Sequence, residues 1–83
     1  MMKFKKGDMV KIREWEAMAE EFGEENGFIQ IPARSFSKRM KKLCGKPAIV
    51  EDADGTAYKL RPMKVEDIGL DWNWDFTDDM LER

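Results

Sequence analysis

One dipeptide, Asp54-Gly55, does most to limit the folds that this chain can adopt. Asp-Gly is a strong signal for a tight turn between antiparallel strands, because these residue types tolerate the positive φ angles that such a turn requires. The residues at 46–51 before it have strand character, and Tyr58 and Leu60 after it alternate with charged residues up to Pro62. We therefore predict a β-hairpin here, and the rest of the fold has to be built around it.

The chain before the hairpin contains two further stretches with strand character. Val10 and Ile12 alternate with charged residues after a Gly-Asp turn signal, which is typical of a short half-buried strand over 9–13. An Asn-Gly turn signal precedes residues 28–31, which we expect to be extended. Pro32 then either ends this extended stretch or makes it an edge strand.

Two segments with helical periodicity lie between the first strand and the hairpin. Over 14–22 the apolar residues recur at i, i+3, i+4 and i+7, which predicts a short helix ending at Gly23. Over 37–44, Ser37 is the predicted N-cap and Gly45 stands where a C-terminal cap belongs. The apolar faces consist of Trp15, Met18, Ala19 and Phe22 in the first helix, and Met40, Leu43 and Cys44 in the second.

The chain after the hairpin predicts one more strand. Residues 63–71 mix apolar and charged side chains and are expected to form a loop with one turn of helix. Trp72, Trp74 and Phe76 then share one face of an expected fourth strand. A single tight helical turn at 77–80, capped by its first residue, is expected to lay the last apolar residues against the end of the fold.

These elements predict a mainly β fold with short helices. With 83 residues the chain is one domain, 1–83, and a 42% hydrophobic, aromatic-rich composition is too apolar for a disordered chain. Several short strands, one tight hairpin and a terminal strand after a helical turn indicate a small, strongly bent β-barrel. The helical segments at about 14–22 and 37–44 are then insertions between strands one and two.

The chain also resembles a known family through separated motifs. "GDMVKI" at 7–12, "GKPAIVEDADGTAYKL" at 45–60 and "WNWDFTDDMLE" at 72–82 are similar to the strands, hairpin and closing turn of KOW-type and Mind-bomb-repeat SH3-like barrels. With "REWEAMAEEFG" and "FSKRMKKLCGK" between them, nearly the whole chain resembles small SH3-like proteins encoded by bacteriophages and prophages. The resemblance implies a fold and a phage setting, but no activity. The stretch 63–71 departs from the family pattern and lengthens a rim loop.

The charges are sorted into blocks, although the net charge is only -2. Residues 14–25 hold six acids and no base, residues 34–46 six bases and no acid, and residues 66–82 seven acids and no base. Such blocks can form ion pairs within the chain, pair with a second copy of the chain, or bind an anionic partner at the basic segment. A whole-protein field that steers nucleic acid or membrane is excluded.

Catalysis has little support in this sequence. The chain has no His, and its only thiol, Cys44, is predicted at a helix C-terminus, where the dipole disfavours the thiolate and a core role is expected. The "DADG" stretch lacks the spacing and the bidentate Glu of a calcium loop. We expect no enzyme, no metal and no cofactor. No apolar run reaches signal-peptide or membrane-span length, so a cytoplasmic, non-membrane protein is expected.

Binding is the remaining class of function, and two versions of it are open. The first is a protein partner, a second copy or a host protein in a phage setting, with partner-binding residues drawn from exposed acidic and apolar loop positions. The second is a nucleotide or short nucleic acid, with phosphates on the basic segment and a base stacked on an aromatic ring. The partner-binding set is Glu20, Glu21, Glu24, Val65, Ile68 and Leu70. The ligand-binding set is Arg34, Lys38, Arg39, Lys41, Lys42, Trp15 and Trp72.

Overall fold

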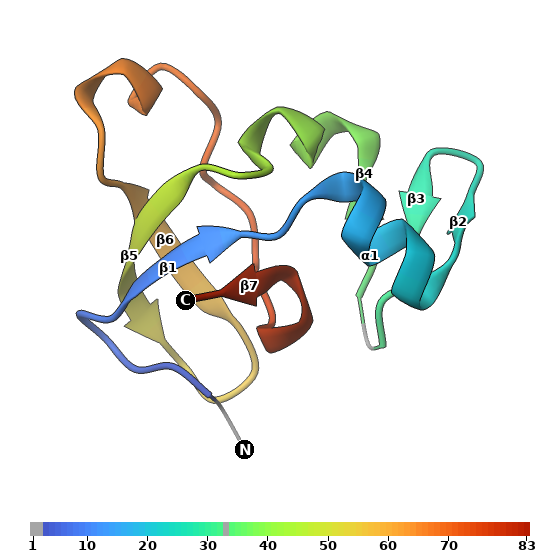
Figure 1. Ribbon diagram of the computed structural model, residues 1–83. Coiled ribbons are helices and arrows are strands. Elements are labelled where there is room, and N and C mark those ends of the chain that lie inside the picture. The colour runs from blue at the N-terminus through green and yellow to red at the C-terminus, as the bar shows by residue number, and fades with distance from the viewer. Residues whose placement is uncertain (1–2, 33) are drawn as a thin grey trace.

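The computed structural model describes residues 3–32 and 34–83 and is built on a four-stranded antiparallel sheet. Its strand order is β6-β5-β1-β7 (Figure 1). The strands are β1 (Met9–Ile12), β5 (Pro47–Ala53), β6 (Tyr58–Pro62) and β7 (Leu81–Glu82). The predicted hairpin is confirmed as β5 and β6, and the predicted first strand as β1 with Val10 and Ile12 buried. Mainly antiparallel strands with short helices agree with the expected fold class.

The hairpin loop is organised by the side chain of Asp54. Its Oδ1 accepts hydrogen bonds from the backbone N–H of Thr56 at 2.9 Å and of Ala57 at 3.0 Å. Gly55 has a φ of 96°, which its missing Cβ allows. A register shift between Val50 and Asp52 bends the hairpin, so that β5 and β6 curve instead of lying flat.

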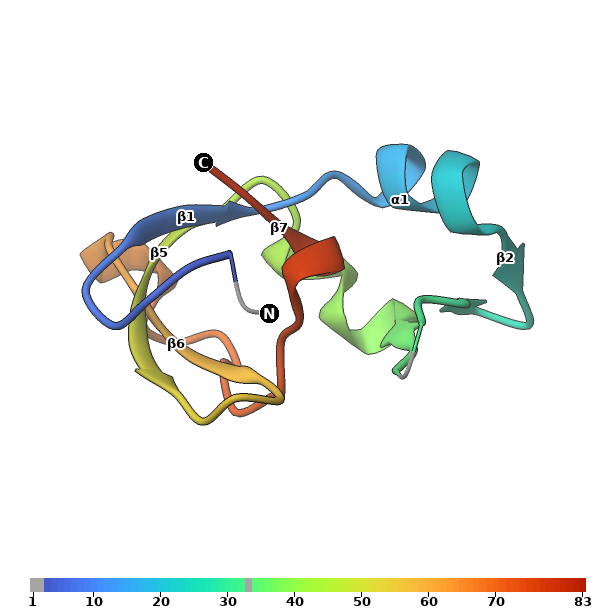
Figure 2. The same ribbon diagram turned by 90° about the horizontal axis from the view of Figure 1, so that it is seen from below.

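The insertion between β1 and β5 forms a second lobe beside the main sheet (Figures 1 and 2). It consists of α1 (Trp15–Phe22), β2 (Glu24–Glu25), β3 (Phe28–Ile29), β4 (Phe36–Ser37) and the 3-10 helix η1 (Lys38–Leu43). The helix over 14–22 is confirmed. The three-stranded sheet β2-β3-β4 was not predicted beyond the extended residues at 28–31, because two-residue strands are too short to show an alternating pattern.

The second predicted helix forms as the 3-10 helix η1, with Ser37 at its N-cap position. The Ser37 hydroxyl makes no capping hydrogen bond, and the residue also pairs with Phe28 in β4. The expected burial of Met40 and Leu43 is confirmed, and Gly45 follows the helix with a φ of 79°.

The predicted strand over 72–76 is also wrong. Only Phe76 pairs, through an isolated bridge with Tyr58, while Trp74 N–H donates to the Trp72 carbonyl at 2.9 Å in a tight local turn. Before this segment lies η2 (Val65–Asp67), the expected helical turn of the loop 63–71. After it comes η3 (Asp78–Met80), where the expected turn forms without a side-chain cap from Thr77.

The sheet is strongly curved but not closed. Through the Tyr58 bridge, Phe76 lies beside one end of β6, and η3 then turns the chain so that β7 pairs with β1 on the far side. Among the described residues β6 and β7 are the two edges and do not pair with each other. In Figure 2 the strands form an arc, and the segment that leads into η3 runs along its open side.

One hydrophobic core joins the main sheet to the insertion. Trp15, Phe36 and Met40 from the insertion belong to the same buried cluster as Tyr58 and Phe76 from the sheet side. Burial of each such side chain contributes about 1.5–3 kcal/mol, so this shared core fixes the insertion against the sheet. Within the described ranges, no helix has the length and apolar character that crossing a membrane requires.

Candidate anionic-ligand site

Three adjacent hollows meet at Trp74, where the insertion contacts the segment before η3. The first, about 490 Å³, is shared with Phe28, Lys38 and Arg39. The second, about 240 Å³, is shared with Arg39, Lys42 and Asp71. The third, about 540 Å³, is bordered by both Arg34 and Lys59. We call these three hollows together the Trp74 groove. It combines two aromatic side chains, Trp74 and Phe28, with cations from three parts of the chain.

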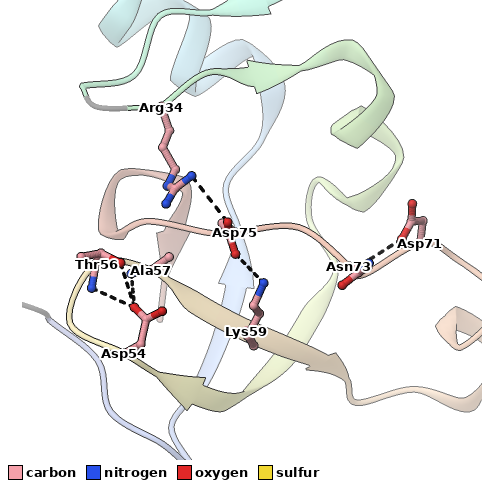
Figure 3. Close-up of polar contacts among 8 residues, drawn as sticks. All are labelled: Arg34, Asp54, Thr56, Ala57, Lys59, Asp71, Asn73 and Asp75. Atoms are coloured by element: carbon pink, nitrogen blue, oxygen red, sulfur yellow. Dashed lines mark hydrogen bonds and ion pairs between the residues drawn. The ribbon is translucent and has the colours of Figure 1, made fainter.

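The Trp74 ring is held in place by a hydrogen bond from its indole: Nε1–H donates to the backbone carbonyl of Asp71 at 2.9 Å. The Asp71 carboxylate in turn accepts a hydrogen bond from the N–H of Asn73 at 3.0 Å (Figure 3). The half-buried ring also packs against the hydrophobic core. Because the indole N–H is already used, the surface that Trp74 offers a ligand is the ring itself.

The geometry of η1 decides which cations enter the groove. In a 3-10 helix residues i and i+3 lie one above the other, so six residues form three separate rows. Met40 and Leu43 make the buried row, and Arg39 and Lys42 make a second row that borders Trp74. Lys38 and Lys41 form the third row. Its first member borders the Phe28 hollow, and the second lies over Trp15 at 5.4 Å from the ring centroid.

Three of these cations are not paired internally. Lys38, Arg39 and Lys42 are exposed, and none of them forms an ion pair with any residue that the structure describes. Their charges are therefore available to a ligand. The guanidinium and the two ammonium groups can donate hydrogen bonds to phosphate groups, and the neighbouring aromatic ring can stack on the base that carries them.

The third hollow contains an internal acid that already binds two cations. The Asp75 carboxylate is bonded to the Lys59 ammonium of β6 and lies 3.6 Å from the Arg34 guanidinium (Figure 3). The hydrogen bond and charge of Lys59 lower the pKa of Asp75, and Arg34 lowers it further. This chain of charges joins the insertion to the sheet, so these two cations are less available than those of η1.

The two predicted stacking rings do not lie in this groove. Trp15 is only 5% exposed: it packs against Phe36, and its Nε1–H donates to a Glu24 carboxylate oxygen at 3.2 Å. Trp72 is half-buried and donates its Nε1–H to the Asp67 carbonyl at 2.9 Å. Trp74 takes the position expected of them. The sequence placed Trp72, Trp74 and Phe76 together on one face of a strand, which concealed the different environment of Trp74.

The predicted acidic partner residues are partly used within the chain. Glu21 pairs with Arg13 at 2.7 Å, and Glu24 is the acceptor of the Trp15 indole. Glu20 is exposed and forms no ion pair within residues 3–32 and 34–83. The acidic surface of α1 therefore stabilises its own lobe in part, and only part of it faces solvent without a partner.

The apolar partner residues divide between solvent and core. Val65 and Ile68 are 85% and 65% exposed, whereas Leu70 is half-buried and packs on the hydrophobic core. The rim loop that carries them is anchored by Asp67, a buried acid 3.3 Å from the Lys46 ammonium. The two exposed side chains, Val65 in η2 and Ile68 directly after it, thus flank this anchor.

The single thiol does not have the environment of a nucleophile. Burial raises the pKa of Cys44 to about 11, and the neighbouring Glu14 carboxylate raises it as well. A reactive cysteine needs the opposite shift. The described residues contain no cluster of three or more His, Cys, Asp or Glu side chains arranged to hold a metal ion.

Comparison with known proteins adds no assignment to this geometry. No protein-family model matches the chain, and the searches of curated proteins and of solved structures returned no match.

Proposed function

We propose that this chain is a non-catalytic binding module whose Trp74 groove holds a nucleotide or a short single-stranded nucleic acid. The observation that carries the proposal is the position of Trp74 beside Lys38, Arg39 and Lys42, three cations without an ion pair in the described chain. Aromatic rings stack on any base, while lysine and arginine neutralise the phosphates. Of the two versions of binding that the sequence left open, this one has the more complete site.

The finer reading of the fold and setting is part of the same proposal. The order of β1, the curved hairpin, the 3-10 turn and β7 supports an SH3-like barrel, with β7 returning to β1 after η3. The motifs quoted from the sequence support a phage-encoded protein that acts in the cytoplasm of the host. In that setting a module for single strands would act on nucleic acid of the phage or of the host.

Charge reversal tests the proposed site directly. The probe is a fluorescein-labelled oligothymidylate of roughly ten nucleotides, whose anisotropy is followed during titration with the protein. We expect the triple variant Lys38→Glu, Arg39→Glu, Lys42→Glu to lose binding while its circular dichroism spectrum and unfolding midpoint stay unchanged.

A matched control separates this site from general electrostatic attraction. The variant Lys5→Glu, Lys6→Glu, Lys64→Glu changes the net charge equally at three exposed positions outside the groove. It is expected to keep most of the affinity. Equal losses in the two triple variants, or no binding by the unaltered protein, would contradict the proposed function.

The exposed rim loop favours a protein partner as the second candidate function. Val65 and Ile68 are exposed to solvent on a loop that the ion pair between buried Asp67 and Lys46 anchors. The loop therefore presents two apolar side chains at the surface. A partner protein with an apolar pocket suits this surface, and two side chains match a small, transient interface. Glu20, which forms no ion pair with the residues that the structure describes, lies on the other lobe and would contact a basic region of such a partner.

Site-specific crosslinking tests this second candidate. A photo-crosslinking residue at Val65 is expected to capture one defined protein, or a second copy of the chain, and the variant Ile68→Ser should abolish that product. The same crosslinking residue at the exposed position Met9, away from the rim loop, serves as the control. If the Val65 and Met9 products are the same, the rim loop is not a docking surface.

A further inference from the structure

The second aromatic ring of the groove, Phe28, was not part of either predicted set. Phe28 is 44% exposed although it is a large apolar side chain. It stands in β3 beside Ile29, which is fully buried, and successive side chains of a strand point to opposite faces. The burial of Ile29 in the core therefore directs Phe28 outward.

Phe28 and Trp74 border the same hollow. This hollow, about 490 Å³, also contacts Lys38 and Arg39, and its lining is more apolar than that of the other two. A volume of this order is within the range of pockets that hold small organic ligands. Two rings at one hollow provide two surfaces on which bases can stack.

The three cations without an ion pair among the described residues run alongside both rings. Lys38 and Arg39 border the hollow that contains Phe28, and Arg39 and Lys42 border the neighbouring hollow at Trp74. Arg39 is common to the two. Positive charge thus extends from one ring to the other, as a backbone with one phosphate per nucleotide requires.

A duplex does not fit this arrangement. Its bases are stacked inside the helix, where neither ring can reach them, and it extends well past the three cations. Asp71 borders the Lys42 hollow, and the acidic strand Glu24–Glu25 pairs with β3 on the other side of Phe28. These carboxylates flank the groove, where the second strand of a duplex would have to lie.

We infer that the ligand is a single strand of at least two nucleotides, which places one base on Trp74 and an adjacent base on Phe28. This inference rests on the proposed function and names its ligand class. The phosphates contact Lys38, Arg39 and Lys42. Thymine and uracil strands present the same phosphates and ring faces, so the comparison of oligothymidylate with oligouridylate identifies whether DNA or RNA is the better ligand.

The test compares ligand length with the loss of each ring. Thymidine monophosphate, the dinucleotide of thymidine and the oligothymidylate of roughly ten nucleotides are titrated against the unaltered protein, Phe28→Leu and Trp74→Leu. Leucine keeps an apolar side chain without a π-face. Met9→Leu is the control, since Met9 is exposed outside the groove.

The expected results differ between the two rings. Phe28→Leu should weaken the dinucleotide and the oligonucleotide by roughly 5- to 150-fold, the range for one lost base stack, and leave the mononucleotide unchanged. Trp74→Leu should weaken all three ligands. If Phe28→Leu has no effect and the mononucleotide binds as tightly as the strand, this inference is overturned while the proposed function stands. If none of the three ligands binds, both are overturned.

Discussion

At the residue scale, single carboxylates organise several local parts of this small fold. Asp54 is solvent-exposed, yet it accepts hydrogen bonds from the N–H groups of Thr56 and Ala57 and so closes the hairpin loop. Asp67 is the one buried acid of the described chain and anchors the rim loop through Lys46. The Asp78 carboxylate accepts a hydrogen bond from the Tyr58 hydroxyl. Burial of the Tyr58 hydroxyl, together with this hydrogen bond, raises the pKa of Tyr58.

The hydrogen bonds of Asp54 predict a loss of stability in acid. They lower its pKa from 3.8 to about 2, so the ionised side chain stabilises the folded state above pH 4 and this contribution disappears as the pH falls to 2. We expect Asp54→Asn to be less stable than the unaltered protein at pH 7, with the difference shrinking between pH 4 and 2. Urea unfolding across this pH range measures it. A stability gap for Asp54→Asn that is constant with pH would contradict the assignment.

Cys44 provides a second prediction at the residue scale. With a pKa of about 11 the thiol is almost fully protonated at pH 8, so alkylation by iodoacetamide should be at least about tenfold slower in the folded protein than in urea. Mass spectrometry of timed samples measures both rates. Equal rates in the two conditions would show that the thiol is neither buried nor shifted.

At the scale of elements, the turn between η1 and β5 controls the geometry of the groove. Gly45 lies at this turn, donates its N–H to the Ile12 carbonyl at 2.8 Å and has a φ of 79°. A Cβ at this position would also contact the Glu14 carboxylate. The turn therefore joins η1, β1 and the start of α1, and it sets the orientation from which η1 presents its cations.

A Gly45→Ala variant tests this role. The positive φ and the contact with Glu14 should together reduce the free energy of unfolding by about 1–3 kcal/mol, measured in urea. Gly69→Ala is the matched control, because a Cβ there meets no atom within 4 Å and its change should stay within about 0.5 kcal/mol. Equal stability of the two variants would mean that a side chain at position 45 causes no strain.

The elements that the sequence predicted correctly are those with strong local signals. The Asp54 turn, the alternation around Val10 and the helical stripe of α1 each specify their structure within a few residues. The sheet β2-β3-β4 could not be predicted, because its two-residue strands depend on backbone pairs such as Phe28↔Ser37 that are specified only by the tertiary fold.

The candidate site was predicted in its charges but not in its aromatic rings. Lys38, Arg39 and Lys42 follow from the basic block, which needs no knowledge of distant contacts. Trp74 and Phe28 lie far apart in the sequence and border the same hollow only because the insertion folds back onto the segment before η3. The alternation at 72–76 predicted a strand face, whereas hydrogen bonds from both indoles to backbone carbonyls hold a turn there.

At the scale of the whole molecule, the sorted charges make binding local and sensitive to salt. The acidic blocks cancel the basic one in the net charge, but the unpaired cations remain together on η1. If three cations contact three phosphates, a plot of the logarithm of the affinity for a single strand against the logarithm of the salt concentration should have a slope of about -2. Anisotropy titrations in stepped NaCl measure this slope.

A single substitution checks that slope. Lys42→Ala should reduce it by about 0.7, the value for one phosphate of a single strand. Lys64→Ala, outside the groove, should leave it unchanged. A slope near zero, or equal changes in the two variants, would show that these cations do not contact the ligand.

The indole N–H signals in a nitrogen-15 NMR spectrum test the central claim most directly, because each of Trp15, Trp72 and Trp74 contributes one resolved signal. On titration with oligothymidylate, the account predicts that the Trp74 signal and the backbone signals of 38–42 shift together, while the buried Trp15 indole, bonded to Glu24, stays in place. Shifts centred on the acidic helix α1 or on the rim loop at η2, with Trp74 unchanged, would contradict it.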